Sequence, residues 1–290
     1  MHALRLLKGM PSIALIALAI ILVPPAADAR DIPSNASTST PKQLIVLSYN
    51  GDADERHDGF FYRELLELVL QKTLSTHGAY EVRLVPVISN ENRLLRAIEQ
   101  GQVDVTWMPY DKHISMALRP VKVSLLKELS NYRLLFIRAG DQEGFSKVTS
   151  LDDLRRLRGG IGAHWPDRQV MRMNELPLTA SVSYSNLFKM LVAGRFDYFP
   201  RGIYQIPVEL KRHGALRLAL ETDLMLYYEN PVYFYVQKDN LALAQRLEQG
   251  LKLAMSDGSY DELLERFPNF QWARDEIARG QRLILELETP

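Results

Sequence analysis

Cysteine is absent from this chain of 290 residues. Without cysteine there can be no disulfide bond, no thiol nucleophile and no metal site built on thiolates. The absence is compatible with an oxidising compartment, where an unpaired thiol is a liability.

A net charge is absent as well, because 35 lysine and arginine residues balance 35 aspartate and glutamate residues. The composition therefore favours neither nucleic acid nor an anionic membrane surface as a partner. The chain lacks the Gly-x-Ser-x-Gly, His-Glu-x-x-His and Gly-x-x-x-x-Gly-Lys-Ser/Thr patterns of hydrolases, metalloproteases and nucleotide-binding proteins. The residues that suggest a metal site follow no compact ligand spacing: Glu55, His57, Asp58, His113 and His164. We therefore expect no metal, no cofactor and no ATPase activity.

The N-terminus predicts a signal peptide. Its apolar run, Ile13 to Val23, has 11 residues and is too short for a bilayer, which needs about 20. Basic residues precede this run, and Ala27-Asp28-Ala29 supplies a small-x-small cleavage site. We expect residues 1–29 to be removed on export, residues 30–42 to form a flexible leader, and the mature protein to be soluble in the periplasm. An uncleaved membrane anchor is the alternative.

Alternating strand-like and helix-like segments predict an α/β fold with a parallel sheet. The expected strands are Gln43–Asn50, Tyr80–Val87, Val103–Met108, Tyr132–Arg138, Leu178–Val182 and Pro231–Gln237. The expected helices include Glu91–Gln100, Leu241–Met255, Tyr260–Phe267 and a terminal helix, Trp272–Leu287. In open parallel sheets, ligands gather at the carboxyl ends of the strands.

One pattern occurs twice along the chain. Leu94, Ile98, Gly101 and Asp104 fall in register with Leu187, Leu191, Gly194 and Asp197. A helix that ends at a glycine and is followed by a buried strand is half of a βαβ unit. The repetition predicts two α/β lobes of similar build. We expect both aspartates to be structural and to accept backbone hydrogen bonds at the junction of helix and strand.

Together with the predicted signal peptide, these stretches resemble the periplasmic solute-binding proteins of the amino-acid-binding type (family 3), the substrate-binding proteins of ABC transporters. The resemblance covers nearly all of the mature chain. It is carried by Leu44–Leu47, Gly101–Val105, Leu151–Leu154 before Gly159–Gly162, Gly194–Asp197 and Ala254–Tyr260.

The resemblance implies a two-lobed, periplasmic-binding-protein-like α/β fold with a two-strand hinge. Leu134–Arg138 and Val232–Val236 are the expected hinge strands. Lobe 1 would contain residues 43–136 and 233–290, and lobe 2 residues 137–232. Such proteins close around a small molecule by hinge bending, and their partner is a membrane permease or a membrane sensor.

One match to the family pattern and one departure from it bear on the ligand. The resemblance implies a lobe 1 arginine that grips a carboxylate, and Arg119 lies about where it belongs. It also implies an acid after the lobe 2 Gly-x-x-Asp to hold an ammonium, but this chain has Arg201-Gly202 there. A cation at that place repels an amino group. An anionic or neutral polar solute is therefore expected in place of an ordinary α-amino acid.

The expected ligand contacts are Tyr49, Trp107, Arg119, Trp165 and Arg201. Aromatic walls suit the apolar parts of ligands. Trp165 adjoins a predicted helix N-terminus, whose backbone N–H groups suit an anion. Arg201 is either an anion clamp or half of an internal ion pair with Glu209 or Asp197.

Binding without catalysis is the leading interpretation. One alternative is a dehydratase-like enzyme on the same scaffold, with Glu55 or Asp58 as acid or base. Another is a regulatory module that keeps the fold without a tight ligand.

Overall fold

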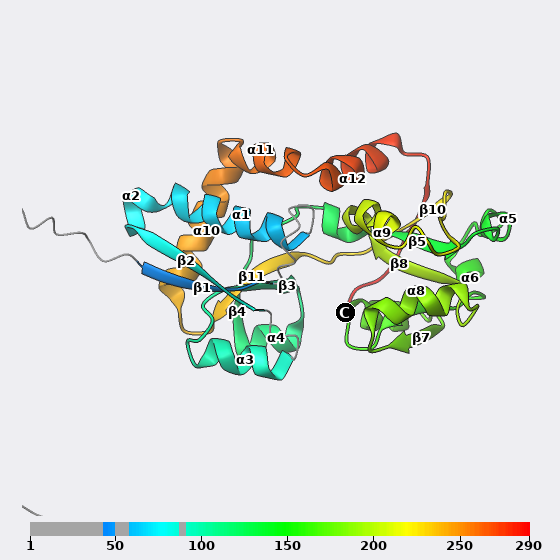
Figure 1. Ribbon diagram of the computed structural model, residues 1–290, viewed down its shortest axis with the longest axis horizontal. Helices are drawn as coiled ribbons and strands as arrows, with labels where there is room; N and C mark the ends of the chain where they lie inside the picture. The colour runs from blue at the N-terminus through cyan, green and yellow to red at the C-terminus, as the bar shows by residue number, and fades with distance from the viewer. Residues whose placement is uncertain (1–42, 50–57, 87–90) are drawn as a thin grey trace, which may run out of the picture. The chain divides into compact units, whose positions relative to one another are not determined.

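The computed structural model describes residues 43–49, 58–86 and 91–290 (Figure 1). The expected signal peptide, the leader, Glu55 and His57 lie outside the described residues. Among the helices of the described part, none is long and apolar enough to cross a membrane.

The first lobe is built on strands from two separate stretches of the described chain, residues 43–121 and 232–237. The strands β1 (Gln43–Tyr49) and β2 (Tyr80–Pro86) pair in parallel. The strand β11 (Val232–Gln237) lies between β3 (Thr106–Pro109) and β4 (Leu118–Val121), antiparallel to both. A parallel bridge from Leu47 to Val105 joins the two groups. As the apolar run Leu44–Leu47 predicts, Ile45, Val46 and Leu47 are buried.

The second lobe is built on one mixed sheet with the strand order β12-β10-β5-β8-β6-β7, and β9 pairs with β5. Its strands are β5 (Tyr132–Arg138), β6 (Gly159–Gly162), β7 (Leu178–Ser181), β8 (Tyr198–Gly202), β9 (Leu218–Leu220), β10 (Leu224–Tyr227) and β12 (Leu283–Glu286). The expected two-lobed α/β fold is confirmed.

Helices lie around the strands of both lobes (Figure 1). The first group is α1 (Asp58–Lys72), α2 (Leu74–His77), α3 (Glu91–Glu99), α4 (Lys112–Ala117), the short η1 (Leu129–Asn131), α5 (Gln142–Phe145) and α6 (Leu151–Leu154). The second group is α7 (Asp167–Met173), α8 (Tyr184–Val192), the short η2 (Ile203–Gln205), α9 (Ile206–Arg212), α10 (Leu241–Ser256), α11 (Ser259–Glu265) and α12 (Pro268–Arg279).

The repeated sequence pattern forms the same junction in both lobes. Gly101 and Gly194 follow α3 and α8 with φ angles of 67° and 69°, a left-handed conformation that glycine adopts without strain. The Asp104 carboxylate accepts the N–H of Val46 at 2.7 Å, and the Asp197 carboxylate accepts the N–H of Arg158 at 2.9 Å. Both aspartates therefore tie their junction to a neighbouring segment, as expected.

The two strands expected to form the hinge each lie within one sheet. The strand β5 pairs only in the second sheet, and β11 pairs only with β3 and β4. The five central residues of β5 are buried, because sheet neighbours and helices cover them. The chain thus passes between the sheets just before each of these strands, through residues 122–131 and 228–231.

The prediction of a terminal helix over Trp272–Leu287 is wrong after Arg279. The helix α12 ends at Arg279, and Gly280 adopts a φ of 59°. The chain then forms β12, parallel to β10, and buries Leu285 and Leu287 in the core of the second lobe. The strand β12 therefore belongs to the second sheet, although its residues fall in the range expected for lobe 1. The lobe boundaries as a whole stay a prediction.

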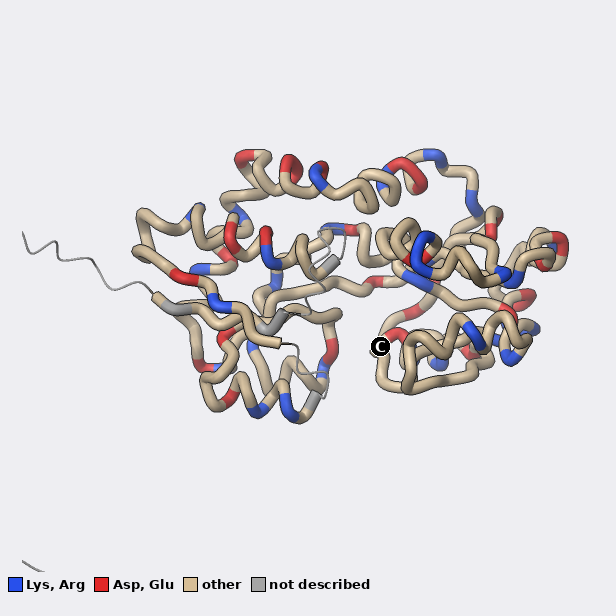
Figure 2. The backbone as a smooth tube through the Cα atoms, viewed as in Figure 1, with Lys and Arg blue, Asp and Glu red and all other residues tan. Residues whose placement is uncertain are grey.

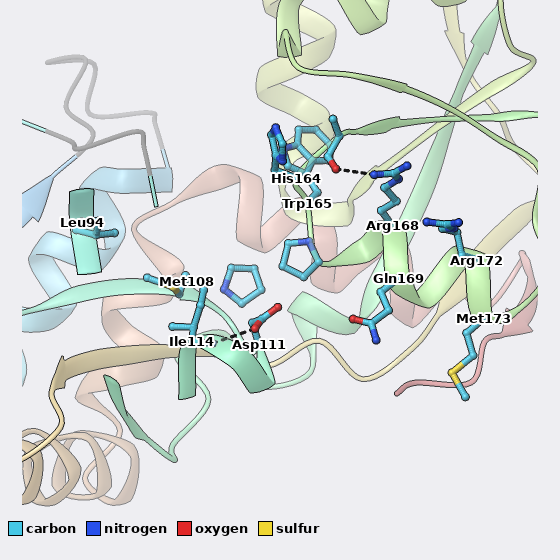
Figure 3. A pocket seen from close by; sticks show the side chains of 13 residues that line it. Leu94, Met108, Asp111, Ile114, His164, Trp165, Arg168, Gln169, Arg172 and Met173 are labelled. Atoms are coloured by element: carbon cyan, nitrogen blue, oxygen red, sulfur yellow. Dashed lines mark hydrogen bonds between the residues drawn. The ribbon is translucent and has the colours of Figure 1, made fainter. Parts of the chain in front are cut away.

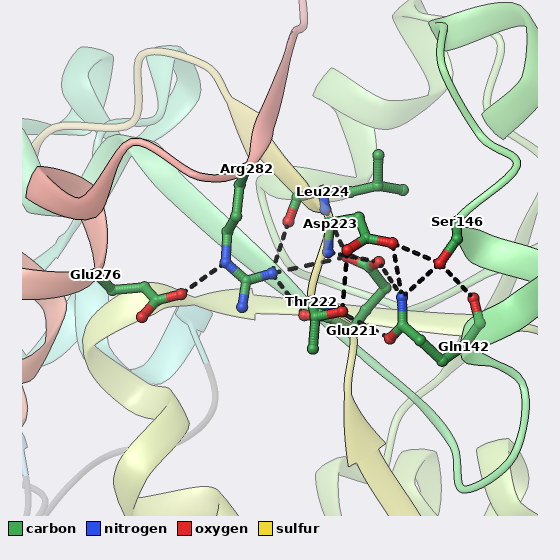
Figure 4. A network of polar contacts seen from close by, with 8 residues as sticks. All are labelled: Gln142, Ser146, Glu221, Thr222, Asp223, Leu224, Glu276 and Arg282. Atoms are coloured by element: carbon green, nitrogen blue, oxygen red, sulfur yellow. Dashed lines mark hydrogen bonds and ion pairs between the residues drawn. The ribbon is translucent and has the colours of Figure 1, made fainter.

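A polar network fixes this last segment (Figure 4). Arg282 donates to the Glu276 carboxylate at 2.7 Å and to the backbone carbonyls of Glu221 and Leu224. The Glu221 carboxylate is fully buried and accepts the side-chain amide of Gln142 at 2.8 Å. Arg282 therefore joins α12 to the edge of the second sheet.

Candidate functional site

A cavity of about 750 Å³ is lined by residues of both lobes. The first lobe contributes Leu94, Met108, Pro109, Asp111 and Ile114, and the second contributes Ala163, His164, Trp165, Pro166, Arg168, Gln169, Arg172 and Met173. In Figure 3, Leu94, Met108 and Ile114 lie across the cavity from the side chains that α7 and the loop before it supply.

The helix α7 presents its polar side chains to the cavity by helical spacing. Arg168 and Arg172 are four residues apart, as are Gln169 and Met173, so each pair shares a face of the helix. Val170 and Met171 face the other way and are buried in the second-lobe core. One side of α7 therefore packs on the second-lobe core, and the other side lines the cavity.

The beginning of α7 is anchored by a buried ion pair. The Asp167 carboxylate accepts two contacts from the Arg133 guanidinium, at 2.9 and 3.0 Å, and a hydrogen bond from the Tyr228 hydroxyl. Burial by itself raises the pKa of Asp167, but Arg133 and the Tyr228 hydrogen bond outweigh it and leave the pKa below its usual value. Arg168 thus extends from a fixed first turn.

The end of α7 is anchored by the C-terminal segment. The Asn174 side chain donates to the carbonyls of Val170, at 2.8 Å, and Glu288, at 2.9 Å. It also accepts the N–H of Glu288 at 2.9 Å. Since both ends of α7 are held, its cavity-facing side chains have a rigid base.

The two arginines of the cavity have no ion-pair partner among the described residues. Arg168 donates to the Ala163 carbonyl at 3.0 Å, and neither Arg168 nor Arg172 forms an ion pair with any described residue. Among the described lining residues, Asp111 is the one acid, and its carboxylate caps α4 by accepting the N–H groups of His113 and Ile114. Elsewhere the two signs of charge are interspersed along the chain (Figure 2). The positive charge in the cavity is therefore local.

Trp165 lies beside a second buried ion pair. The Arg201 guanidinium contacts the Glu209 carboxylate at 2.6 to 3.0 Å and lies 4.6 Å from the centre of the Trp165 ring. The Tyr184 hydroxyl also donates to Glu209, at 2.7 Å. The Trp165 ring itself fits because Gly162 has no side chain, since a Cβ there would lie 2.3 Å from it. The ion pair and the glycine thus position this aromatic wall of the cavity.

The Arg201 charge is balanced within the protein. Burial alone lowers the pKa of Arg201, but the Glu209 carboxylate reverses this and raises the pKa above its usual value. Burial and then Glu209 also raise the pKa of Tyr184. Of the two alternatives for Arg201, the internal ion pair with Glu209 is the one observed.

No protein-family model matches the chain, and no curated protein sequence matches it. Solved structures do match. An ancestral arginine-binding protein bound to arginine is 17% identical, over 78% of this chain and 97% of that one, with a TM-score of 0.56. A histidine kinase sensor domain with similarity to periplasmic binding proteins is 14% identical, over 78% and 96%, with a TM-score of 0.57. The ancestral amino-acid-binding protein AncCDT-1, a precursor of cyclohexadienyl dehydratase, is 15% identical, over 77% and 95%, with a TM-score of 0.54.

This chain has the fold of the periplasmic binding proteins. The resemblance inferred from the sequence is confirmed at the level of the fold. Within this periplasmic-binding-protein fold, the expected contact residues are dispersed. Trp165 lines the cavity and Arg201 lies directly behind it, but the other three are elsewhere or undescribed.

Arg119 lies away from the cavity. It is opposite Val236 in the β4–β11 pair, whereas the cavity residue Pro109 is opposite Val232 at the other end of β11. Its Nε donates to the Lys238 carbonyl at 2.7 Å. The register of β4 therefore places Arg119 at the far end of the first-lobe sheet.

Trp107 is not among the described residues that line this cavity. Trp107 stacks on Tyr62, with 4.9 Å between ring centres, and packs against the main core. Tyr49 ends β1, and its side chain lies outside the described part. Two of the backbone N–H groups near Trp165, where an anion was expected, already form hydrogen bonds in turns. The Trp165 N–H donates to the Gly162 carbonyl, and the Arg168 N–H donates to the Trp165 carbonyl.

The sequence interpretation missed Arg168 and Arg172. Their signal was available as two arginines four residues apart after a glycine-rich strand. Met171 on the same helix is fully buried, whereas Met173 is 49% exposed and lines the cavity. No group of three or more potential metal ligands occurs among the described residues.

Proposed function

We propose that this protein is a periplasmic solute-binding protein that captures a small anion in the cavity between α7 and the first lobe. Arg168 and Arg172 grip the anion, and Trp165 forms one wall. The predicted signal peptide delivers the protein to the periplasm, where the loaded form serves a membrane permease or a membrane sensor. The fold supports this role, because structures that share it include amino-acid-binding proteins and a sensor domain.

One observation carries the anion proposal. Arg168 and Arg172 face the cavity without a carboxylate partner among the described residues. A charge-assisted hydrogen bond from each guanidinium to the anion would replace water on a cation that has no ion-pair partner in the described part of the chain. These residues take the role that the sequence analysis assigned to Arg119 and Arg201.

Binding is favoured over dehydratase chemistry by the state of Asp111. The carboxylate of this lining residue accepts two backbone N–H groups, at 2.7 and 3.1 Å. Both N–H groups are accepted by the same oxygen, Oδ1, so this side chain serves as the cap of α4. The membership of Tyr49 in the site stays a prediction.

Isothermal titration with acetate, phosphate, methylamine and glucose tests the proposal. We expect binding of at least one anion and none of the amine. Arg168→Gln and Arg172→Gln should each weaken anion binding about 10-fold or more, the value of one charged hydrogen bond. Arg195→Gln is the matched control, because Arg195 is exposed and does not line the cavity.

Mass spectrometry of molecules released from the purified protein provides the second arm. Recovery of an α-amino acid or an amine, bound equally well by the Arg168→Gln/Arg172→Gln variant, would refute the anion proposal. Recovery of an acid whose affinity falls in that variant would support it.

A further inference from the structure

We infer that the ligand is an organic acid with an apolar body, whose carboxylate meets α7 while its hydrocarbon part meets the first lobe. This inference rests on the proposed function and specifies the class of solute. It follows from the opposite character of the two sides of the cavity.

The first-lobe side is apolar. Leu94 from α3, Met108 from β3 and Ile114 from α4 line it together with Pro109 (Figure 3). Ile114 belongs to a small buried cluster of the first lobe, and Leu94 and Met108 pack against that cluster. These side chains are therefore supported from behind and present a fixed hydrocarbon surface.

The second-lobe side combines charge with apolar surface. Met173 follows Arg172 directly, is 49% exposed and lines the cavity. The Trp165 ring, held by Arg201, adds a flat apolar surface. Each cation of α7 thus lies beside apolar surface from the same lobe.

A ligand with a polar body would find few partners on the first-lobe side. Asp111 is the one described lining residue of that side with a charged side chain, and its carboxylate is engaged as the cap of α4. Hydroxyl or amino groups placed against Leu94 and Met108 would lose water without replacement hydrogen bonds, which costs affinity. Methylene groups placed there gain affinity by leaving water.

The same contrast separates organic acids from inorganic anions. Phosphate or sulfate can reach the arginines but is too small to cover the apolar side as well. Only a molecule with both parts contacts both lobes, so only such a molecule links them across the cavity.

The test is a titration of straight-chain monocarboxylates from acetate to octanoate, with phosphate and hexanamide beside them. We expect affinity to rise about fourfold for each methylene buried, until the cavity is filled. Leu94→Gln and Met173→Gln should each reduce this gain, weakening hexanoate at least about threefold and more than they weaken acetate. Leu253→Gln is the matched control, because Leu253 is 39% exposed on α10 and does not line this cavity.

The outcomes separate the inference from the proposed function. If affinity is independent of chain length, yet falls in Arg168→Gln, the apolar inference is overturned while the anion proposal stands. If hexanamide binds as tightly as hexanoate, the negative charge of the ligand does not contribute to affinity. The proposed function then fails, and so does the part of the inference that assigns a carboxylate to the ligand. Both the inference and the proposed function are supported by two results together. Affinity rises less steeply with chain length in Leu94→Gln than in the unchanged protein, and hexanamide binds at least about 10-fold more weakly than hexanoate.

Discussion

Replacing Glu209 by glutamine tests the buried ion pair behind Trp165. The change keeps the size and the hydrogen-bonding shape of the side chain but removes its charge. Arg201 would then be a buried cation without a counterion, since its side chain is 10% exposed and that of Glu209 is 5% exposed.

The expected cost follows from these contacts. Loss of one partner of a buried pair destabilises a protein by about 3–5 kcal/mol. The glutamine oxygen can still accept one hydrogen bond, and the Trp165, Tyr184 and Phe199 rings lie 4.6 to 5.3 Å from the guanidinium carbon. We therefore expect Glu209→Gln to lower the free energy of unfolding by about 3 kcal/mol, at the lower end of that range.

The double variant Arg201→Met/Glu209→Leu removes both charges and should be more stable than Glu209→Gln, because no unpaired charge remains. Urea denaturation followed by circular dichroism measures both. Glu248→Gln is the control, since Glu248 pairs with Lys252 at the surface and its loss should cost at most about 0.5 kcal/mol. The reasoning is wrong if Glu209→Gln costs less than about 1 kcal/mol, or if the double variant is the less stable of the two.

Three further substitutions test other parts of the fold. Tyr198→Phe removes a buried hydroxyl that has no hydrogen-bond partner in the described part of the chain, so urea denaturation should show a gain of about 1 kcal/mol in the free energy of unfolding. A loss of stability would mean that the hydroxyl is hydrogen-bonded. Burial lowers the pKa of His213 below 6.5, so the native state disfavours the imidazolium. The free energy of unfolding should therefore fall as the pH drops from about 6.5 toward that lower pKa, and His213→Phe should remove this fall in melts at pH 7.5 and 5. Gly250→Ala places a Cβ 2.3 Å from the Val69 carbonyl oxygen where α10 meets α1, and should cost about 2 kcal/mol in urea denaturation; a neutral result would show that the helices can separate.

The parts of the fold that local chemistry determines were predictable from the sequence. Gly101 and Gly194 must end their helices in a left-handed conformation, and the residues around them encode the helix and the strand on either side. Neither junction needs a distant partner to be recognised. The two-lobed fold followed from finding this junction twice.

The errors arose where a distant partner decides the structure. The segment Leu283–Glu286 continues the apolar pattern of a helix, but Gly280 ends the helix and β10 supplies the backbone partners of a strand. Sequence alone could not choose between a ligand, Glu209 and Asp197 as the partner of Arg201, whereas the structure pairs it with Glu209. The register of β4 moved Arg119 to the opposite end of its sheet.

The position of β11 has a consequence for the order in which the chain assembles. Synthesis runs from the N-terminus, and β11 is the strand that lies between β3 and β4. The strands β3 and β4 are therefore synthesised before their shared partner, and they cannot form this sheet until Val232 to Gln237 has been made. The strands β5 to β10 come from one continuous stretch, so most of the second sheet can form while the first is still incomplete. The first sheet is therefore completed by β11 only after β5 to β10 have been made, and β12 is the last strand to join the second sheet.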